Sequence, residues 1–111
     1  MHVEIKRPEP VQHAGPQHVS EGVMAAALIY KVQPEYPYMA KMARISGAVK
    51  LRAIISADGK IRQLEVISGP PLLQAAAVAA VRNWRYRPTT LNGTSVEVDT
   101  LITVNFILNE P

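Results

Sequence analysis

The last part of the chain carries the pattern that most restricts its fold. Between positions 96 and 108 every second side chain belongs to one largely apolar row, formed by Val96, Val98, Thr100, Ile102, Val104, Phe106 and Leu108. This alternation is typical of a β-strand that buries one face. Thirteen residues at about 3.3 Å each span on the order of 40 Å, which is long for a small domain. Shorter partner strands would leave part of it unpaired, and an unpaired edge is a docking site or an aggregation hazard.

A β-hairpin is expected before this strand. Residues 49–55 alternate apolar with basic side chains, as in a half-buried strand. Asp58-Gly59 then supplies a turn in which the chain reverses with positive φ. The return strand is expected from Ile61 to about Ser68. The hairpin and the final segment together predict three antiparallel strands.

Two helices are expected to cover this sheet. The segment 38–45 follows Pro37, which suits a helix start, and stops before Gly47. An apolar stripe at helical spacing consists of Leu73, Ala76, Ala77, Ala80, Val81 and Trp84. Because Trp84 completes this stripe, a core position is preferred for it over an exposed aromatic anchor. Residues 28–32 are expected to form a short strand, and the alanines before them also fit a helical turn.

These elements predict an α+β fold with two helices packed on a three-stranded antiparallel sheet. An apolar content of 48% with 19% charged residues is compatible with a soluble core in one domain. Residues 1–18 are rich in proline and lack periodicity, so they are expected to form a disordered or extended tail, with residues 19–111 as the folded domain. The sequence contains neither a signal peptide nor the ~20 apolar residues needed to cross a bilayer.

The residues that enzymes and cofactor sites require are poorly represented. The chain has no cysteine, and its three histidines all lie in the predicted tail, so neither a catalytic base nor a metal site is expected on the fold. Glu97 and Asp99 share a strand face, where solubilising charges are preferred over an acid pair. The net charge of +3 does not indicate nucleic acid, because no aromatic side chains interleave with Lys50, Arg52 and Arg62. A binding module without enzymatic activity or cofactor is therefore predicted.

An ordered set of short motifs resembles the C-terminal domain of the TonB family over about residues 32–108. The matching pieces are Gln33-Pro34-Glu35-Tyr36-Pro37, Ala40 to Arg44, Gly47-Ala48-Val49, Asp58-Gly59, Ile67-Ser68-Gly69, Ala76 to Val81, Trp84-Arg85-Tyr86-Arg87-Pro88, Asn92-Gly93 and Val104-Asn105-Phe106. That family folds as two helices against a three-stranded antiparallel sheet. Structural roles are accordingly expected for Gly47, Asp58, Gly59, Trp84, Tyr86 and Pro88.

The resemblance also implies a function. TonB is anchored in the inner membrane of Gram-negative bacteria and driven by a proton-motive-force motor complex. Its periplasmic C-terminal domain grips the TonB box of outer-membrane transporters, which adds to the sheet as a strand, and the resulting pull admits nutrients such as iron chelates. Partner contacts are expected here from Gln33, Pro34, Tyr36 and Pro37, and along the last strand from Val96, Glu97, Val98, Asp99, Thr100, Leu101 and Ile102.

Two departures from the family pattern leave alternatives open. The sequence contains no membrane anchor, and its proline-charge linker is reduced to Arg7-Pro8-Glu9-Pro10. The chain is thus expected to be a periplasmic portion, normally tethered to the inner membrane and reaching the motor complex through an N-terminal part that this sequence lacks. The same domain occurs as the tail of membrane sensors and antirepressor proteins. A self-associating β module, such as a homodimer through the long edge, is the alternative outside the family.

Overall fold

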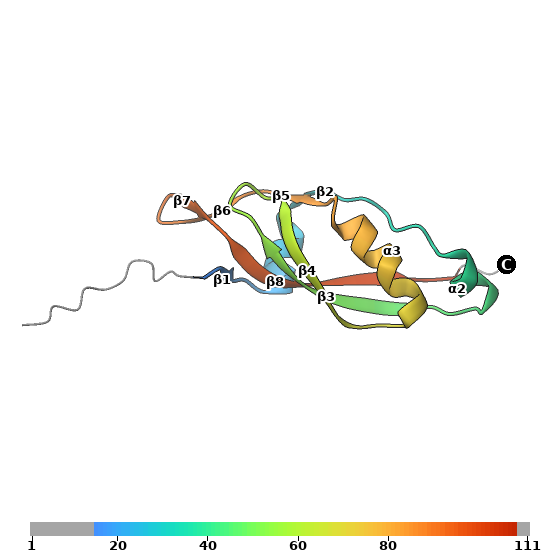
Figure 1. Cartoon of the computed structure of the whole chain (residues 1–111). Helices are drawn as coiled ribbons and strands as arrows, with labels where there is room; N and C mark the ends of the chain where they lie inside the picture. The colour runs from blue at the N-terminus through green and yellow to red at the C-terminus, as the bar shows by residue number, and fades with distance from the viewer. Residues whose placement is uncertain (1–14, 109–111) are drawn as a thin grey trace, which may run out of the picture.

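The long alternating segment forms a central strand of a mixed sheet. The computed structural model describes residues 15–108 and has an α+β fold. Its main sheet has four strands in the order β1-β8-β3-β4 (Figure 1). The strands are β1 (Gln17–His18), β3 (Gly47–Ile55), β4 (Ile61–Ser68) and β8 (Val98–Phe106). β3 lies between β8 and β4 and is antiparallel to both, as expected, whereas β1 is an additional strand that runs parallel to β8.

The final strand is shorter than its alternation suggests. Residues Thr94–Val96 form a separate strand, β7, which pairs with β6 (Thr89–Leu91) in a small hairpin. The hairpin turns at Asn92 and Gly93, which both have positive φ, 53° and 82°. These angles suit a two-residue turn of the type that Asn-Gly favours. The alternating pattern therefore continues across two strands that belong to different sheets.

The β3–β4 hairpin forms where the sequence predicts it, and its turn is tightly held. Gly59 has φ of 92°, and its amide donates to the carbonyl of Ser56 at 2.9 Å. The Ser56 hydroxyl donates to the carboxylate of Asp58 and accepts from the amide of Lys60 at 3.2 Å. The hydrogen bond from Ser56 lowers the pKa of Asp58 below its ordinary value. The turn is therefore fixed by its own side chains.

A short strand crosses beside this turn and leaves no room for a side chain at Gly59. The strand is β5 (Arg85–Tyr86), which pairs antiparallel with β2 (Leu28–Tyr30). The amide of Tyr86 donates to the carbonyl of Gly59 at 2.9 Å. A Cβ atom at Gly59 would lie 1.9 Å from the carbonyl oxygen of Tyr86. The Asp-Gly turn thus forms part of the packing between the hairpin and β5.

Helix α3 (Pro71–Val81) lies against one face of the sheet, as Figure 1 shows. Its buried side chains are Leu73, Ala77, Ala80 and Val81, which belong to the predicted stripe. Of these, Leu73, Ala77 and Val81 pack in one core with buried residues of β3 and β8, which are Val49, Leu51, Ala53, Ile55, Val98, Ile102, Val104 and Phe106. The proline at its first position fits the helix start.

Two shorter helices flank this core. With α3 they make three helices among the described residues, whereas the sequence predicts two. α2 (Tyr38–Met42) buries Ala40 and ends earlier than the expected segment 38–45. The additional helix is α1 (Glu21–Ala26), which includes part of the alanine run that also fits a helical turn, and its Met24 is buried. The Ser20 hydroxyl caps α1 by accepting from the amide of Val23 at 3.3 Å. A six-residue helix has less than two turns of periodicity, so its pattern was too short to separate it from a strand.

The last two residues of the expected N-terminal tail belong to the folded domain. Residues 17 and 18 were expected in the tail, but they form β1 and pair with Val98 and Asp99. The rest of the predicted tail, up to residue 14, lies outside the described residues, as do residues 109–111. Within residues 15–108, none of the helices has the length and apolar character needed to cross a membrane.

Candidate strand-docking site

One side of β8 exposes its backbone over most of the strand. The amide of Gln17 donates to the carbonyl of Glu97 at 2.9 Å, and the amide of Val19 donates to the carbonyl of Asp99 at 3.0 Å. Because strand geometry repeats every two residues, the backbone groups of Leu101, Thr103 and Asn105 are directed to the same side. In the described part of the chain, β8 has no strand partner on this side beyond Asp99.

Two adjoining hollows lie along this open stretch. The first has a volume of about 120 Å³ and lies between α1, β2, β5 and residues 101–103. The second has a volume of about 110 Å³ and lies between the segment after β2 and residues 103–105. Both hollows are lined by Lys31, Trp84 and Thr103, so they form one groove. We call it the edge groove; its defining residues are Lys31, Gln33, Pro34, Trp84, Leu101, Thr103 and Asn105.

Trp84 forms the base of the edge groove and anchors its outer wall. The side chain is buried, with 5% of the residue exposed. Its indole Nε1 donates to the carbonyl of Val32 at 2.9 Å, and the Lys31 ammonium lies 5.5 Å from the ring centroid. A cation at this distance is attracted to the face of the ring. One residue in the turn after α3 therefore positions the segment that lines the groove opposite β8.

The motif that begins at Gln33 lies partly in the lining of the edge groove and partly against the core. Gln33 is exposed, and with Pro34 it lines the second hollow. Tyr36 is half-buried; its hydroxyl donates to the carbonyl of Ile45, and its ring meets Phe106 edge-on at 5.5 Å. Pro37 is the N-cap residue of α2. Gln33 and Pro34 are thus placed at the groove, whereas Tyr36 and Pro37 lie outside its lining and fix the course of the chain.

The expected contact stretch from Val96 to Ile102 is only partly accessible. Val96 belongs to β7 and pairs with Thr89. Val98 and Thr100 are buried in the core. The edge-facing carbonyls of Glu97 and Asp99 already accept hydrogen bonds from Gln17 and Val19. Of the seven expected residues, only Leu101 and Ile102 line the groove. The open edge therefore begins later than expected, because the chain occupies the first part of this edge itself.

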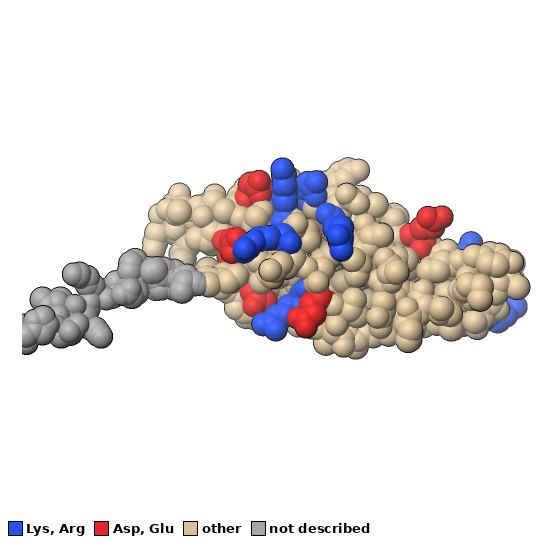
Figure 2. Space-filling model, viewed as in Figure 1, with Lys and Arg blue, Asp and Glu red and all other residues tan. Residues whose placement is uncertain are grey.

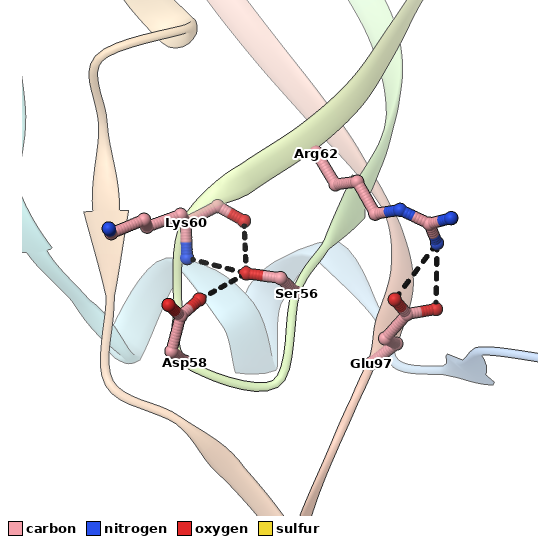
Figure 3. Close-up of polar contacts among 5 residues, drawn as sticks. All are labelled: Ser56, Asp58, Lys60, Arg62 and Glu97. Carbon is pink, nitrogen blue, oxygen red and sulfur yellow. Dashed lines mark hydrogen bonds and ion pairs between the residues drawn. The ribbon is translucent and has the colours of Figure 1, made fainter.

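Ion pairs hold the acidic side chains of this occupied stretch. Figure 2 shows basic and acidic side chains gathered around the middle of the visible face. Arg62 binds both carboxylate oxygens of Glu97, at 3.0 and 2.9 Å, beside the Ser56–Lys60 turn (Figure 3). Arg52 contacts Asp99 at 3.3 Å, and the hydrogen bond that its guanidinium donates to Asp99 raises the pKa of Arg52. These are exposed pairs of the kind that contribute little to stability.

Three residues of the groove were not predicted from the sequence. Thr103 and Asn105 lie on the same strand face as Leu101, so continuing the alternation past Ile102 would have identified them. Lys31 gave no such signal, because its place depends on Trp84, 53 positions later in the chain. No group of three or more metal-ligating side chains occurs among residues 15–108. What the groove offers is an open backbone edge with polar side chains around a buried aromatic ring.

Comparison with known proteins identifies relatives along most of the chain. The family model described as the Gram-negative bacterial TonB protein C-terminal matches residues 32–108. Protein TonB of Klebsiella pneumoniae is 37% identical over 86 residues, covering 73% of this chain and 32% of that protein. Protein TonB of Escherichia coli K12 is 32% identical over 75 residues, covering 66% of this chain and 31% of that protein.

A solved structure agrees with the fold. The solution NMR structure of the Pseudomonas aeruginosa TonB CTD superposes with a TM-score of 0.63 at 24% sequence identity, covering 76% of this chain and 87% of that one. The chain spans about a third of the length of the two TonB relatives named above. With the family model covering 77 of 111 residues, from 32 to 108, the chain belongs to the family of Gram-negative bacterial TonB C-terminal domains.

Proposed function

We propose that this chain is the periplasmic binding domain of a TonB-type energy transducer and that it has no enzymatic activity. The partner is the TonB box of a TonB-dependent outer-membrane transporter, which adds as a strand to β8 in the edge groove. Through an N-terminal part tethered to the inner membrane, the domain would receive the pull of the proton-driven motor complex. Family membership supports the general role.

The open stretch of β8 is the observation that carries this proposal. An extended peptide that pairs with Leu101–Asn105 gains main-chain hydrogen bonds, which supply affinity largely independent of its sequence. Every second side chain of such a peptide would turn toward the hollows at Trp84. Gln33 lines the wall opposite β8, and its amide can donate and accept at once. It is therefore suited to bond the outer side of an added strand.

The backbone contribution can be tested by isothermal titration with a panel of synthetic TonB-box peptides. Thr103→Pro removes an amide that faces the open edge while leaving the pairing with β3 on the other side intact. Thr103→Val keeps that amide and changes only the side chain. Binding is expected to weaken strongly in Thr103→Pro and to persist in Thr103→Val. A folded Thr103→Pro protein with undiminished affinity would contradict the proposal.

The contribution of Gln33 has a matched control in its own segment. Gln33→Ala is expected to weaken peptide binding by about 0.5–1.5 kcal/mol, the range for one accessible hydrogen bond, without lowering the melting temperature. Glu35→Ala changes an exposed neighbour that does not line the groove, so it should leave affinity unchanged. Should Gln33→Ala lower stability but not affinity, Gln33 would be a structural residue.

Self-association through the same edge is the competing use of this surface. Sedimentation at several protein concentrations separates the two cases, since a homodimer that buries β8 would dissociate on adding the peptide. A dimer that binds itself more tightly than any peptide of the panel would favour the structural module.

A further inference from the structure

β1 uses the same side of β8 that the proposed partner would use. The amides of Gln17, in β1, and of Val19, directly after it, donate to the carbonyls of Glu97 and Asp99, and the open stretch begins at the next edge-facing residue, Leu101. A peptide confined to Leu101–Asn105 leaves β1 in place. A longer strand that continues toward Glu97 needs the two carbonyls that β1 occupies.

We propose that β1 is an internal, displaceable strand that inhibits the binding of long peptides to β8. It limits the accessible edge to the stretch next to Trp84, and a longer partner strand replaces it. This inference rests on the proposed function, because it concerns the regulation of the same edge.

The attachment of β1 is weak enough to be displaced. The strand has two residues, Gln17 and His18, and both side chains are exposed. Val19, which follows, is half-buried and is the one side chain of this stretch that packs against the hydrophobic core. Segments with few buried contacts and exposed hydrogen bonds open most easily. A competing strand that forms the same backbone bonds and adds side-chain contacts in the groove would therefore replace it.

The neighbouring structure can stay folded when β1 leaves. Ser20, directly after Val19, caps α1 through its hydroxyl, and Met24 anchors that helix in the core with 2% of the residue exposed. Neither contact involves Gln17 or His18. Release of β1 would thus end at Ser20, and the wall of the edge groove formed by α1 would be preserved.

Proline substitutions test the inference without shortening the chain. The double variant Gln17→Pro/Val19→Pro removes the two amides that donate to Glu97 and Asp99. His18→Pro is the matched control, because the amide of His18 is directed away from β8 by the alternation of the strand. Each protein is titrated with two synthetic TonB-box peptides. The short peptide has five residues, enough to pair with Leu101–Asn105, and the longer peptide is extended at both ends.

The long peptide is expected to bind the double variant about tenfold more tightly than wild type or His18→Pro, since two weak hydrogen bonds no longer compete. The short peptide is expected to bind all three proteins equally. In wild type, the long peptide should also abolish the slow hydrogen exchange of the Val19 amide, measured by NMR.

Each alternative result has a separate meaning. If the long peptide binds wild type and the double variant equally and Val19 remains protected, β1 is not inhibitory, while the proposed function stands. If neither peptide binds any of the three proteins, both the inference and the proposed function are wrong. Binding of the long peptide to the double variant alone would support both.

Discussion

The indole Nε1 of Trp84 donates a hydrogen bond of 2.9 Å to the carbonyl oxygen of Val32, which lies 52 residues earlier in the chain. This bond joins the segment directly after α3 to the segment that faces β8 across the edge groove. The same ring is part of the hydrophobic core. Trp84 therefore couples the stability of the domain to the shape of the candidate site.

Replacement of Trp84 by alanine is expected to destabilise the domain by about 3–5 kcal/mol, the range for truncating a large buried side chain. Trp84→Phe keeps much of the apolar volume but leaves the Val32 carbonyl without its donor, so a smaller loss of about 1–2 kcal/mol is expected. Urea denaturation followed by circular dichroism measures both. An unchanged midpoint for Trp84→Ala would show that the ring does not support the core.

Gly59→Ala is expected to destabilise the domain more than Gly93→Ala. Both glycines have positive φ, 92° and 82°, and such a residue with a side chain costs about 1–2 kcal/mol. A Cβ atom at Gly59 would in addition lie 1.9 Å from the carbonyl oxygen of Tyr86, whereas nothing lies within 4 Å at Gly93. Thermal unfolding of the two variants separates the steric clash from the backbone strain. Equal losses would mean that β5 moves away from the turn at no cost.

Thr100→Val is expected to stabilise the domain. Thr100 is fully buried, and its hydroxyl oxygen has no hydrogen-bond partner. Removing an unsatisfied buried polar group while keeping the shape recovers about 1 kcal/mol or more of desolvation free energy. Thr103→Val on the same strand, where the side chain is half-buried, serves as the control and should change stability little. A loss of stability in Thr100→Val would indicate that the hydroxyl is hydrogen-bonded in solution.

The stability of the domain is expected to fall between about pH 10 and about pH 12 because of Tyr86. Burial, assisted by the negative charge of Glu21, raises the pKa of Tyr86 from 10.0 to about 12. The folded state therefore retains the phenolic proton at pH values where the unfolded state releases it, so stability is complete below pH 10 and is lost as the pH rises through this window. Urea midpoints of wild type should decline across it more steeply than those of Tyr86→Phe. Parallel declines would show that Tyr86 titrates alike in both states.

Helices longer than two turns, strands longer than four residues and the Asp-Gly turn were predictable from the sequence. The alternation in β3 and β8, the Asp58-Gly59 turn and the stripe of α3 all specify local structure that tertiary contacts only reinforce. For α1 the sequence allowed no more than a helical turn, because its six residues are stabilised by one cap and by the burial of Met24. β1 was not predictable for a similar reason, since two residues carry no period and pair only because β8 is adjacent.

The sequence indicates the strand that carries the candidate site, but not which part of its edge is open. The long strand and Gln33 indicated an open edge beside the proline motif, and the structure places Gln33 beside Thr103 and Asn105. The expected contact stretch includes Glu97 and Asp99, whose carbonyls are already bonded, because the sequence does not reveal that Gln17 and Val19 bond there. Which part of an edge is free depends on what else the chain places against it.

β1 enters the sheet parallel to β8, and this direction decides how the pair responds to tension. A force transmitted along the chain from the N-terminal side of Gln17 acts along the strand axis, while a ligand held at Leu101–Asn105 would resist it from further along β8. Such a load stretches the bonds from Gln17 and Val19 together, in shear, and does not open them one after the other. The pairing of β1 with β8 would therefore resist a force along the strand axis, in which both bonds stretch together, better than replacement by a competing strand, which breaks them one at a time.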